Sequence, residues 1–538
     1  AGLERARPRR GRRLDTAAAL ALPGVERVLT ASDFSGDLRV GLKARDWPTL
    51  VAVGATTRYV GDCLAVVLAN DRRTARQAAA LVAVTYTTMT ALVDPEEALL
   101  PSAPALHEGG NLLSRTWIAR GDANAALAAA AHVVQRRYQT QRVEHAFLEP
   151  ETCLALPQPD GGLEVFSQGQ GVYEDRRQLA ALLGWPEARL RVHQVAAGGA
   201  FGGKEDLSVQ GQACLAAVAT GRAVRIELSR DESIRLHPKR HPMVMDWRLG
   251  CDASGRLVGL QARIVGDGGA YASVSAEVLA RAASHATGGY EVPAVEIEAL
   301  AVYTNNPPCG AFRGFGVNQV HFAMECAVDE LCELGGFDRW QLRWDNALRT
   351  GSSTAAGQVL SGPVGLRDCL MAVQPAFRAA PRAGLALGMK NVGVGGPGDS
   401  GCCRLLVGEG GQVTIQHGFS EMGQGVQTVA AQILSEALGE VDGFRAADVV
   451  VEVNTGHDLA VGMTTASRAT SLLGSAIIDA AGQLRDALAD APLSALAGSN
   501  WLGTWRPPPG TAEGDHFHYS YGWAAQVVVM PVPTSCSQ

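Results

Sequence analysis

A glycine-rich segment at residues 198–206 contains the residue types that point most directly to chemistry. It reads Gly-Gly-Ala-Phe-Gly-Gly-Lys-Glu-Asp, so four glycines precede adjacent charges of opposite sign. Glycine lets the backbone approach a ligand that a Cβ atom would hold off, and it accepts positive φ. The segment therefore predicts a backbone cradle for an anionic or planar ligand. A triphosphate-binding loop is excluded, because Glu205 follows Lys204 where that motif needs serine or threonine to hold magnesium.

Three further segments have the same character and lie far apart in the chain. They are Ala-Phe-Arg-Gly-Phe-Gly at 311–316, His-Gly-Phe-Ser-Glu-Met-Gly-Gln-Gly at 417–425 and Thr-Thr-Ala-Ser-Arg-Ala-Thr at 464–470. In this order, and with the segments 60–67, 144–150 and 519–522, they resemble the molybdenum-cofactor subunit of the molybdenum hydroxylases, the xanthine dehydrogenase and aldehyde oxidase family. The resemblance covers nearly the whole chain.

The resemblance implies a site for a polyanionic molybdopterin cofactor, whose metal is held by the pterin dithiolene and not by protein side chains. The histidine pair His516 and His518 has no further ligands nearby, so no metal site is expected there. Amide side chains suit pterin edges, and a guanidinium suits phosphate oxygens. Whether the cofactor is the cytosine dinucleotide form stays open. The implied cofactor-binding residues are Gln170, Phe201, Gly202, Arg313, Gly423, Gln424, Gly425, Ser467, Arg468, Ala469 and Thr470.

Three residues are expected to act on the substrate. Purine-oxidising relatives have a glutamate after the Phe-Gly-Gly-Lys sequence and an arginine 32 positions before the arginine of the Phe-Arg-Gly-Phe-Gly segment, and this chain has Glu205 and Arg281 there. A guanidinium stabilises negative charge that develops on a purine during oxidation, and a carboxyl group can orient the ring and relay a proton. Phe315 is expected to pack on the ring. The alternative for Arg281 is an arginine on a helix surface, and the alternative for Glu205 is an acid that stabilises the start of a helix.

The sequence departs from the family pattern at the general base. In relatives this base is a glutamate in a Gly-x-Gly-Glu motif beyond the equivalent of Tyr519–Gly522, and no such motif follows here. We therefore expect a chain truncated at both ends that still encodes most of the cofactor site. Three functions stay open: a subunit that oxidises a purine such as xanthine or hypoxanthine with oxygen from water, an aldehyde or other N-heterocycle oxidoreductase, and a non-catalytic cofactor-binding remnant. The carbon monoxide dehydrogenase branch is disfavoured, because Gly314 replaces its cysteine.

Composition limits the partners. A net charge of −7 argues against nucleic acid, and no apolar run reaches the length of a membrane span. The eleven cysteines include no Cys-x-x-Cys pair, so iron–sulfur clusters and FAD are expected on other domains or subunits. The resemblance implies a dimer of the whole assembly. Reduced cysteines favour a cytoplasmic location, although six arginines among the first 13 residues leave an export signal as an alternative.

Periodicity predicts a mixed α+β fold. Residues 1–100 predict an α/β domain like the family's hammerhead domain, residues 115–345 a first molybdopterin-binding domain, and residues 350–538 a second one that is incomplete at its C-terminus. Helices are predicted for 173–183, ending at Gly184, and from Phe315 to Leu334. A strand–loop–helix order recurs in the second and third regions, which predicts two related lobes around a shared cleft.

Overall fold

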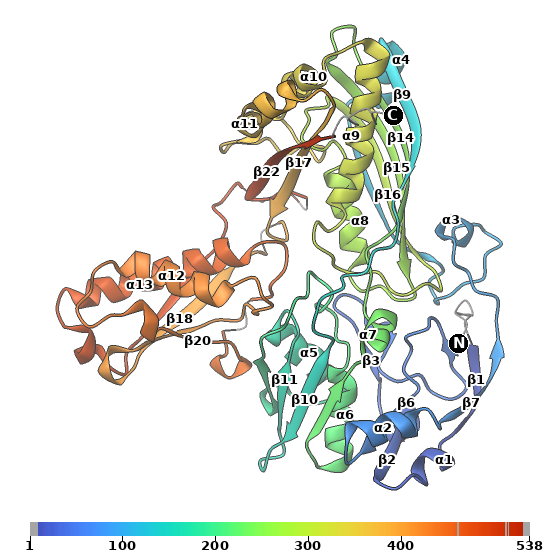
Figure 1. Cartoon of the computed structure of the whole chain (residues 1–538), viewed down its shortest axis with the longest axis vertical. Coiled ribbons are helices and arrows are strands. Elements are labelled where there is room, and N and C mark those ends of the chain that lie inside the picture. The colour runs from blue at the N-terminus through green and yellow to red at the C-terminus, as the bar shows by residue number, and fades with distance from the viewer. Residues whose placement is uncertain (1–8, 397, 460–461, 512–513, 515, 531–538) are drawn as a thin grey trace, which may run out of the picture.

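The computed structural model describes residues 9–396, 398–459, 462–511, 514 and 516–530. As predicted, the fold is mixed α/β. Long strands with helices α8 and α9 lie at one end of the molecule, the N-terminal elements lie at the other, and a unit containing α12 and α13 projects to the side (Figure 1). Within the described part of the chain, no helix combines the length and hydropathy needed to cross a bilayer.

The N-terminal residues form short antiparallel strands covered by small helices. Helix α2 (Arg72–Ala79) begins at Asp71, whose carboxylate accepts hydrogen bonds from the backbone N–H groups of Arg73 and Thr74. The strands are β1 (Arg9–Asp15) between β5 (Thr56–Thr57) and β7 (Ala83–Thr88), and β2 (Val25–Thr30) paired with β6 (Ala65–Ala69).

One βαβ-containing unit occurs twice. In each copy an antiparallel hairpin is followed by a helix, a strand parallel to the second hairpin strand, a second helix and an edge strand. The first copy contains β10 (Thr152–Pro157), β11 (Leu163–Ser167), α5 (Val172–Leu183), β12 (Leu190–Gln194), α6 (Gln210–Thr220) and β13 (Val224–Glu227). The second contains β18 (Gly401–Val407), β19 (Val413–Gln416), α12 (Val426–Leu438), β20 (Val450–Glu452), α13 (Gly474–Leu488) and β21 (Asn500–Trp505).

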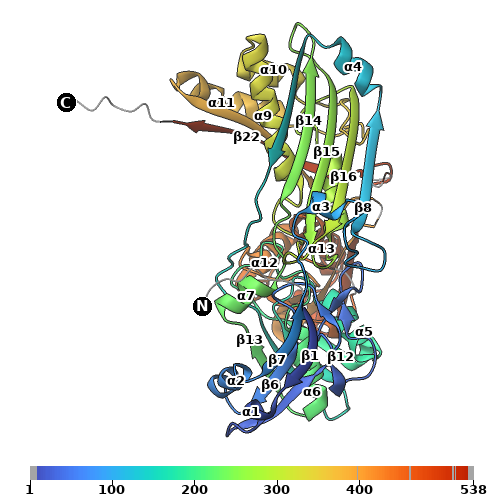
Figure 2. The same cartoon turned by 90° about the vertical axis from the view of Figure 1, so that its right-hand side faces the viewer.

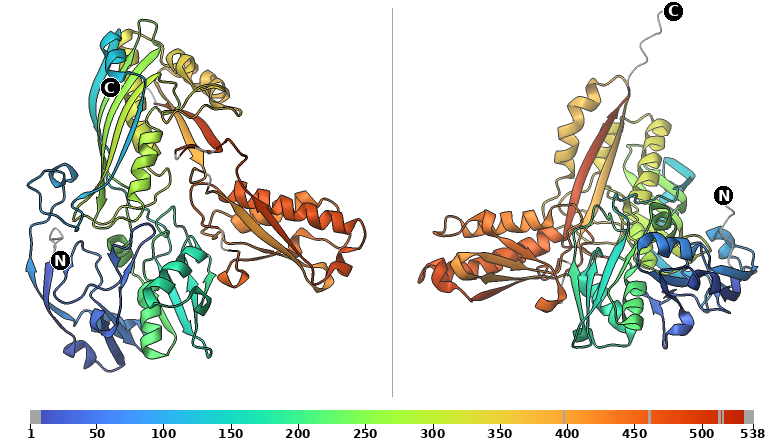
Figure 3. Two further views of the ribbon diagram at one scale, coloured as in Figure 1. Left: turned by 180° about the vertical axis from the view of Figure 1, so that it is seen from behind. Right: turned by 60° about the horizontal axis from the view of Figure 1, so that its bottom comes forward.

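The two copies lie side by side (Figure 3) and touch through isolated antiparallel bridges. Gly171, at the start of α5, pairs with Phe419, and His193 on β12 pairs with Asn454 after β20. Each bridge joins corresponding segments of the two copies. The loop after β11 therefore corresponds to the loop after β19, and the loop after β12 to the loop after β20. This correspondence places the loops that follow β11, β12, β19 and β20 at the boundary between the copies.

A five-stranded sheet forms the other large element, and its strands run along the long axis of the molecule (Figure 2). Helices α8 (Ser275–Ser284) and α9 (Val317–Gly335) pack on one face of this sheet. In strand order the sheet contains β8 (Leu112–Arg120), β16 (Ala294–Tyr303), β15 (Leu257–Gly269), β14 (Met243–Cys251) and β9 (His132–Gln139).

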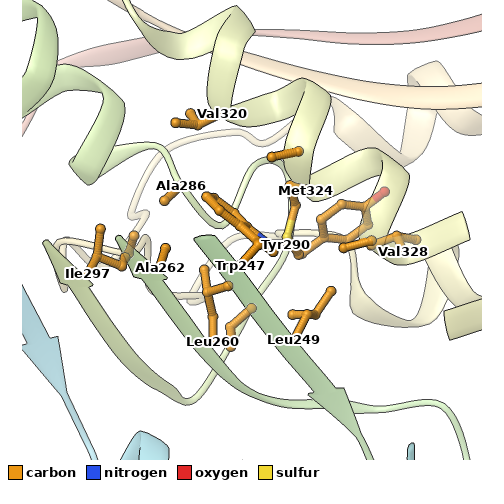
Figure 4. Packing of buried hydrophobic residues seen from close by; sticks show 14 of the residues in the cluster. Trp247, Leu249, Leu260, Ala262, Ala286, Tyr290, Ile297, Val320, Met324 and Val328 are labelled. Carbon is orange, nitrogen blue, oxygen red and sulfur yellow. The ribbon is translucent and has the colours of Figure 1, made fainter. Parts of the chain in front are cut away.

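The largest hydrophobic core lies between this sheet and α9, where Trp247, Tyr290 and Met324 are fully enclosed (Figure 4). A two-stranded ribbon of β17 (Ala383–Val392) and β22 (Ser520–Val529) adds Leu385 and Leu387 to the same core. Helix α11 (Leu366–Ala379) packs against this ribbon. Segments far apart in the chain thus share one core.

The local predictions agree with the structure where glycine ends a helix. Helix α5 stops at Gly184 (φ 66°) and α9 at Gly336 (φ 68°), both in the left-handed conformation that glycine adopts without strain. On α9 the predicted face of Val320, Ala323 and Met324 is buried. The ten described cysteines are all free.

Candidate active site

Four loops meet where the two repeated units adjoin. We call them the glycine loop (198–206), the Phe-Arg loop (311–316), the Gly-Gln-Gly loop (417–425) and the Ser-Arg loop (462–470). The glycine loop holds the other three together. Its Phe201 carbonyl accepts a hydrogen bond from the Arg313 N–H at 2.9 Å, and its Gly199 N–H donates to the Met422 carbonyl at 3.0 Å.

Gln170 connects the glycine loop to the Ser-Arg loop. Its side-chain oxygen accepts hydrogen bonds from the N–H groups of Gly202 (3.0 Å) and Lys204 (3.3 Å), and its side-chain nitrogen donates to the Thr464 carbonyl at 2.7 Å. The residue is 1% exposed. One N–H of the side-chain amide remains for a ligand. The sequence predicted only a cofactor contact for Gln170, whereas in the structure its side chain also holds two loops together.

The loops carry unusual backbone conformations. Among the described residues seven non-glycine residues have positive φ, and four of these are Phe201 (57°), Phe315 (51°), Ala466 (52°) and Ser467 (54°). Such conformations cost about 1–3 kcal/mol each and persist only where the surroundings enforce them. At Gly202 (φ 104°) a Cβ atom would lie 2.6 Å from the Ala311 carbonyl oxygen. The glycine is therefore what lets the glycine loop and the Phe-Arg loop touch.

The Phe-Arg loop is seated on helix α8, the helix that carries Arg281. A Cβ atom on Gly316 would lie 2.4 Å from the Val278 carbonyl oxygen and 3.3 Å from the Ala282 N–H nitrogen. This close approach places Phe315, the residue before Gly316, beside the same helix, where it packs against the edge of the main core.

Glu205 is buried at 5% exposure, and its carboxyl group is hydrogen-bonded to Thr465 of the Ser-Arg loop. Burial raises the pKa of Glu205 to about 8, and the neighbouring Asp206 carboxylate adds to this rise, while Thr465 and Arg468 oppose it. At neutral pH the group is therefore mainly protonated. A protonated carboxyl group can donate a hydrogen bond as well as accept one.

This raised pKa predicts how stability depends on pH. The folded chain keeps the Glu205 proton up to about pH 8, whereas an unperturbed glutamate loses it near pH 4.5, so the folded state binds more protons between these values and stability falls as pH rises through them. We expect the thermal midpoint to fall with pH less steeply in Glu205→Gln than in the wild type across this window. Glu187→Gln, at an exposed carboxylate, should keep the wild-type slope; equal slopes in all three proteins would contradict the assignment.

Arg281 projects from α8 toward the segment that precedes β22. One guanidinium nitrogen donates to the His518 Nε2 atom, and the other donates to the Val394 carbonyl at 2.6 Å. Burial lowers the pKa of Arg281 to about 10, although the group stays charged at neutral pH. The sequence offered no partner for Arg281. His518, considered there only for a metal, is the residue that fixes it.

An ion pair between Arg468 and Asp399 lies between the two substrate candidates. Arg468 Nη1 is 2.9 Å from Asp399 Oδ1, and Asp399 Oδ2 accepts a hydrogen bond from the Val394 N–H at 2.8 Å. Arg468 also acts electrostatically on Glu205, and Asp399 acts on Arg281. The pair thus joins the surroundings of Glu205 to those of Arg281. Asp399 has no motif around it and was missed in the sequence.

Because both members are largely shielded from water, loss of one should be costly. The Arg468 side chain is 13% exposed and the Asp399 side chain is not exposed. We expect Asp399→Asn to lower the free energy of unfolding by about 3 kcal/mol, since it leaves a shielded guanidinium without its counter-charge. Urea denaturation measures this change. The double variant Asp399→Asn/Arg468→Gln should recover part of the loss, and failure to recover any of it would show that the charge is not the cause.

Most of the remaining predicted cofactor residues are exposed, and two of them, Gln424 and Ala469, have a defined backbone or side-chain setting. The exposed ones are Phe201, Arg313, Gly423, Gln424, Ser467 and Thr470, and the Arg313 guanidinium makes no hydrogen bond or ion pair with any described residue. Gln424 instead bonds within its own loop, accepting from the Met422 N–H (2.8 Å) and donating to the Ser420 carbonyl (2.9 Å). Ala469 begins a helical turn, Ala469–Leu473, whose first N–H groups lack intrahelical partners.

Glu421 accepts hydrogen bonds from the N–H groups of Gly423 (2.8 Å), Gly425 (3.0 Å) and Gln427 (3.2 Å). Its carboxylate therefore caps the start of α12 and shapes the Gly-Gln-Gly loop. A residue held in this way is not a substitute for the family's general base.

In the described part of the chain, the group of side chains with the spacing of a metal site is Glu144, His145 and His237, and not the pair His516 and His518. His237 lies between two carboxylates, 2.7 Å from Glu144 and 3.1 Å from Glu151. Lys239 also pairs with Glu144 at 2.9 Å. We interpret this group as an ion-pair network under the glycine loop, because the lysine disfavours a cation.

Comparison with known proteins agrees with this geometry. Residues 10–90 match the aldehyde oxidase and xanthine dehydrogenase a/b hammerhead domain, and residues 106–347 and 374–498 match two molybdopterin cofactor-binding domains. The chain is 38% identical over 357 residues to the nicotinate dehydrogenase large molybdopterin subunit of Eubacterium barkeri, covering 66% of this chain and 84% of that protein. This chain belongs to the molybdenum hydroxylase family.

Two other relatives of this hydroxylase chain bear on its extent and fold. It is 36% identical over 468 residues to a probable xanthine dehydrogenase subunit of Bacillus subtilis, which covers 85% of this chain and 62% of the relative. The aldehyde oxidoreductase of Desulfovibrio gigas superposes with a TM-score of 0.90 at 25% identity, over 97% of this chain and 61% of that one. The chain thus spans less than two thirds of the length of these two proteins.

Proposed function

We propose that this chain is the molybdenum-cofactor subunit of a hydroxylase that oxidises a purine, such as xanthine or hypoxanthine, with water as the source of oxygen. The observation that carries the proposal is the pair of substrate candidates joined through Arg468 and Asp399. Glu205 brings a buried, mainly protonated carboxyl group, and Arg281 brings a guanidinium fixed by two hydrogen bonds. Together they can hold a heterocycle that gains negative charge.

The four loops fit a large polyanionic cofactor. The Arg313 guanidinium is exposed at the meeting point of the loops, and the open helical turn at Ala469–Leu473 presents N–H groups there. A Cβ atom on Gly425 would meet nothing within 4 Å, so the Gly-Gln-Gly loop leaves space in front of its backbone. Arg313, Gln170 through its remaining N–H, and the turn that follows Ser467 would hold the cofactor. When bound, the cofactor supplies two-electron oxidation chemistry.

The side chains of this chain then orient the substrate. The Arg281 guanidinium stabilises charge on an exocyclic oxygen of the purine as it develops, and the Glu205 carboxyl group donates or accepts a proton at a ring nitrogen. Phe315 packs on the ring face. Because two electrons must leave, the chain would work with iron–sulfur clusters and FAD on other domains or subunits, in a dimer of the assembly. A cytoplasmic location remains our expectation.

Oxidation of an aldehyde or another N-heterocycle is the second candidate. It is supported by the names of similar proteins, a nicotinate dehydrogenase subunit and an aldehyde oxidoreductase. A cofactor-binding protein without turnover is the third candidate.

Metal and turnover measurements on the chain, expressed with its electron-transfer partners, test these candidates together. We expect about one molybdenum per chain, a pterin fluorescence signal after acid release, and reduction of a redox dye by xanthine or hypoxanthine. Turnover of aldehydes alone would favour the second candidate. A loaded but inactive assembly would favour the third, and a chain without molybdenum or pterin would refute all three.

A further inference from the structure

A cluster of basic side chains surrounds Arg281. It consists of Arg281 from α8, His285 directly after α8, His321 from α9, Lys390 from β17, and His518 from the segment before β22, and we call it the basic cluster. The His285 and His518 rings lie 6.0 Å apart between centroids, and Arg281 donates to His518. Four separate parts of the chain therefore bring basic side chains together.

Negative charge does not balance this cluster within the described residues. None of its five members makes an ion pair with a described carboxylate. Asp399 acts electrostatically on Arg281 but is bound to Arg468. Burial and the Arg281 charge lower the pKa of Lys390 to about 7. Burial and the charges of Arg281 and Lys390 likewise lower the pKa of His518 to about 2 and hold that of His285 well below its usual range.

Hydrogen-bonding capacity is also left over in the cluster. The buried atoms His518 Nδ1, His285 Nε2 and His321 Nε2 have no hydrogen-bond partner among the described residues. Because His518 Nε2 accepts from Arg281, its proton lies on Nδ1, which is an unsatisfied donor in a residue that is 1% exposed. A buried donor without an acceptor is destabilising. An oxygen anion would satisfy the donor and the charges at once, whereas a metal cation would be repelled by Arg281 and Lys390.

We propose that the basic cluster binds an oxygen-centred anionic group on the substrate ring, so that the substrate is an anionic N-heterocycle. The inference rests on the proposed function, because it places the substrate beside Arg281. Two sources of the same chemistry exist: a carboxylate substituent on the ring, or an exocyclic oxygen that gains negative charge when the ring loses a proton. Lys390 and His518 are then specificity-determining residues, since Lys390 offers a positive charge and His518 an N–H donor to the anionic group.

Binding measured without turnover tests the inference separately from the reaction. The cofactor-loaded assembly is titrated by calorimetry, with electron acceptors excluded, with a pyridine carboxylate, its uncharged carboxamide, and xanthine across its ionisation. We expect the wild type to bind at least one anion about tenfold or more tightly than the uncharged form, a difference of about 1.4 kcal/mol. Lys390→Met should remove this preference. Lys43→Met, at an exposed lysine near Glu277 (3.6 Å), should retain it.

Each arm decides a separate point. Preference for the carboxylate assigns a ring substituent, and xanthine affinity that follows its ionisation assigns a ring oxyanion. Equal affinity for charged and uncharged forms in the wild type, or an unchanged preference in Lys390→Met, overturns the inference. The acids Glu513 and Asp515 lie outside the described residues, and a preference that appears only in Glu513→Gln/Asp515→Asn would show that the chain neutralises the cluster itself. Purine turnover without anion preference defeats this inference alone, while Lys390-dependent binding without turnover defeats only the proposed reaction.

Discussion

Replacing Arg281 by methionine should lower kcat/KM for xanthine by about 10²–10³-fold in the cofactor-loaded assembly. The reason is that an aligned cation at a site of developing charge typically contributes this much to catalysis, and the two hydrogen bonds from Arg281 to His518 and Val394 fix its direction. Steady-state dye reduction measures the change. Molybdenum content should stay at the wild-type value, because Arg281 lies on α8 and outside the four loops.

The matched control is Arg115→Met, which removes an exposed arginine that pairs with Glu298 at 2.7 Å on the five-stranded sheet. It should leave xanthine turnover unchanged. An aldehyde offers a second internal comparison, because it has no ring on which charge can develop, and its turnover should fall far less in Arg281→Met. Full xanthine turnover by a folded, loaded Arg281→Met protein would refute the purine assignment.

Replacing Gly202 by alanine should reduce the molybdenum retained per chain by about tenfold or more. The added Cβ atom would lie 2.6 Å from the Ala311 carbonyl oxygen, in a backbone conformation (φ 104°) that alanine adopts only with strain. Strain of this kind costs about 1–3 kcal/mol, and each 1.4 kcal/mol changes an equilibrium about tenfold. The glycine loop would have to move off the Phe-Arg loop and break the hydrogen bond from the Arg313 N–H to the Phe201 carbonyl.

Gly184→Ala is the control for strain alone. Gly184 also has positive φ (66°), but a Cβ atom there would meet nothing within 4 Å, and the residue lies at the end of α5. Metal analysis should find wild-type molybdenum in Gly184→Ala and little in Gly202→Ala. Equal retention in both variants would mean that contact between the two loops does not hold the cofactor.

Part of the fold was readable in the sequence because it depends on neighbours along the chain. Apolar spacing followed by glycine located α5 and α9, and a glycine past the last turn ends a helix through its own backbone freedom. The four motifs, three of which contain glycine, indicated the family and its cofactor-binding domains, which the comparisons confirmed. The resemblance identified Glu205 and Arg281 through their spacing from other motifs, and their roles remain predictions.

The repeat was only partly readable. The sequence showed a strand–loop–helix order in two regions, but it did not show which loops correspond. The bridges from Gly171 to Phe419 and from His193 to Asn454 pair the loops, so the Gly-Gln-Gly loop corresponds to the loop of Gln170. The domain boundaries that we drew remain predictions. The main core, which comes mostly from the predicted region 115–345, also includes Leu385 from the region 350–538.

The sequence by itself thus determined the family, the helix ends and the identity of the loop residues. Only the tertiary structure decided that Gln170 joins two loops, that Asp399 pairs with Arg468, and that His518 fixes Arg281. The physical reason is separation along the chain. Propensity and capping act over a few residues, whereas the partners of these three side chains lie 294, 69 and 237 residues away and meet only because the core brings their elements together.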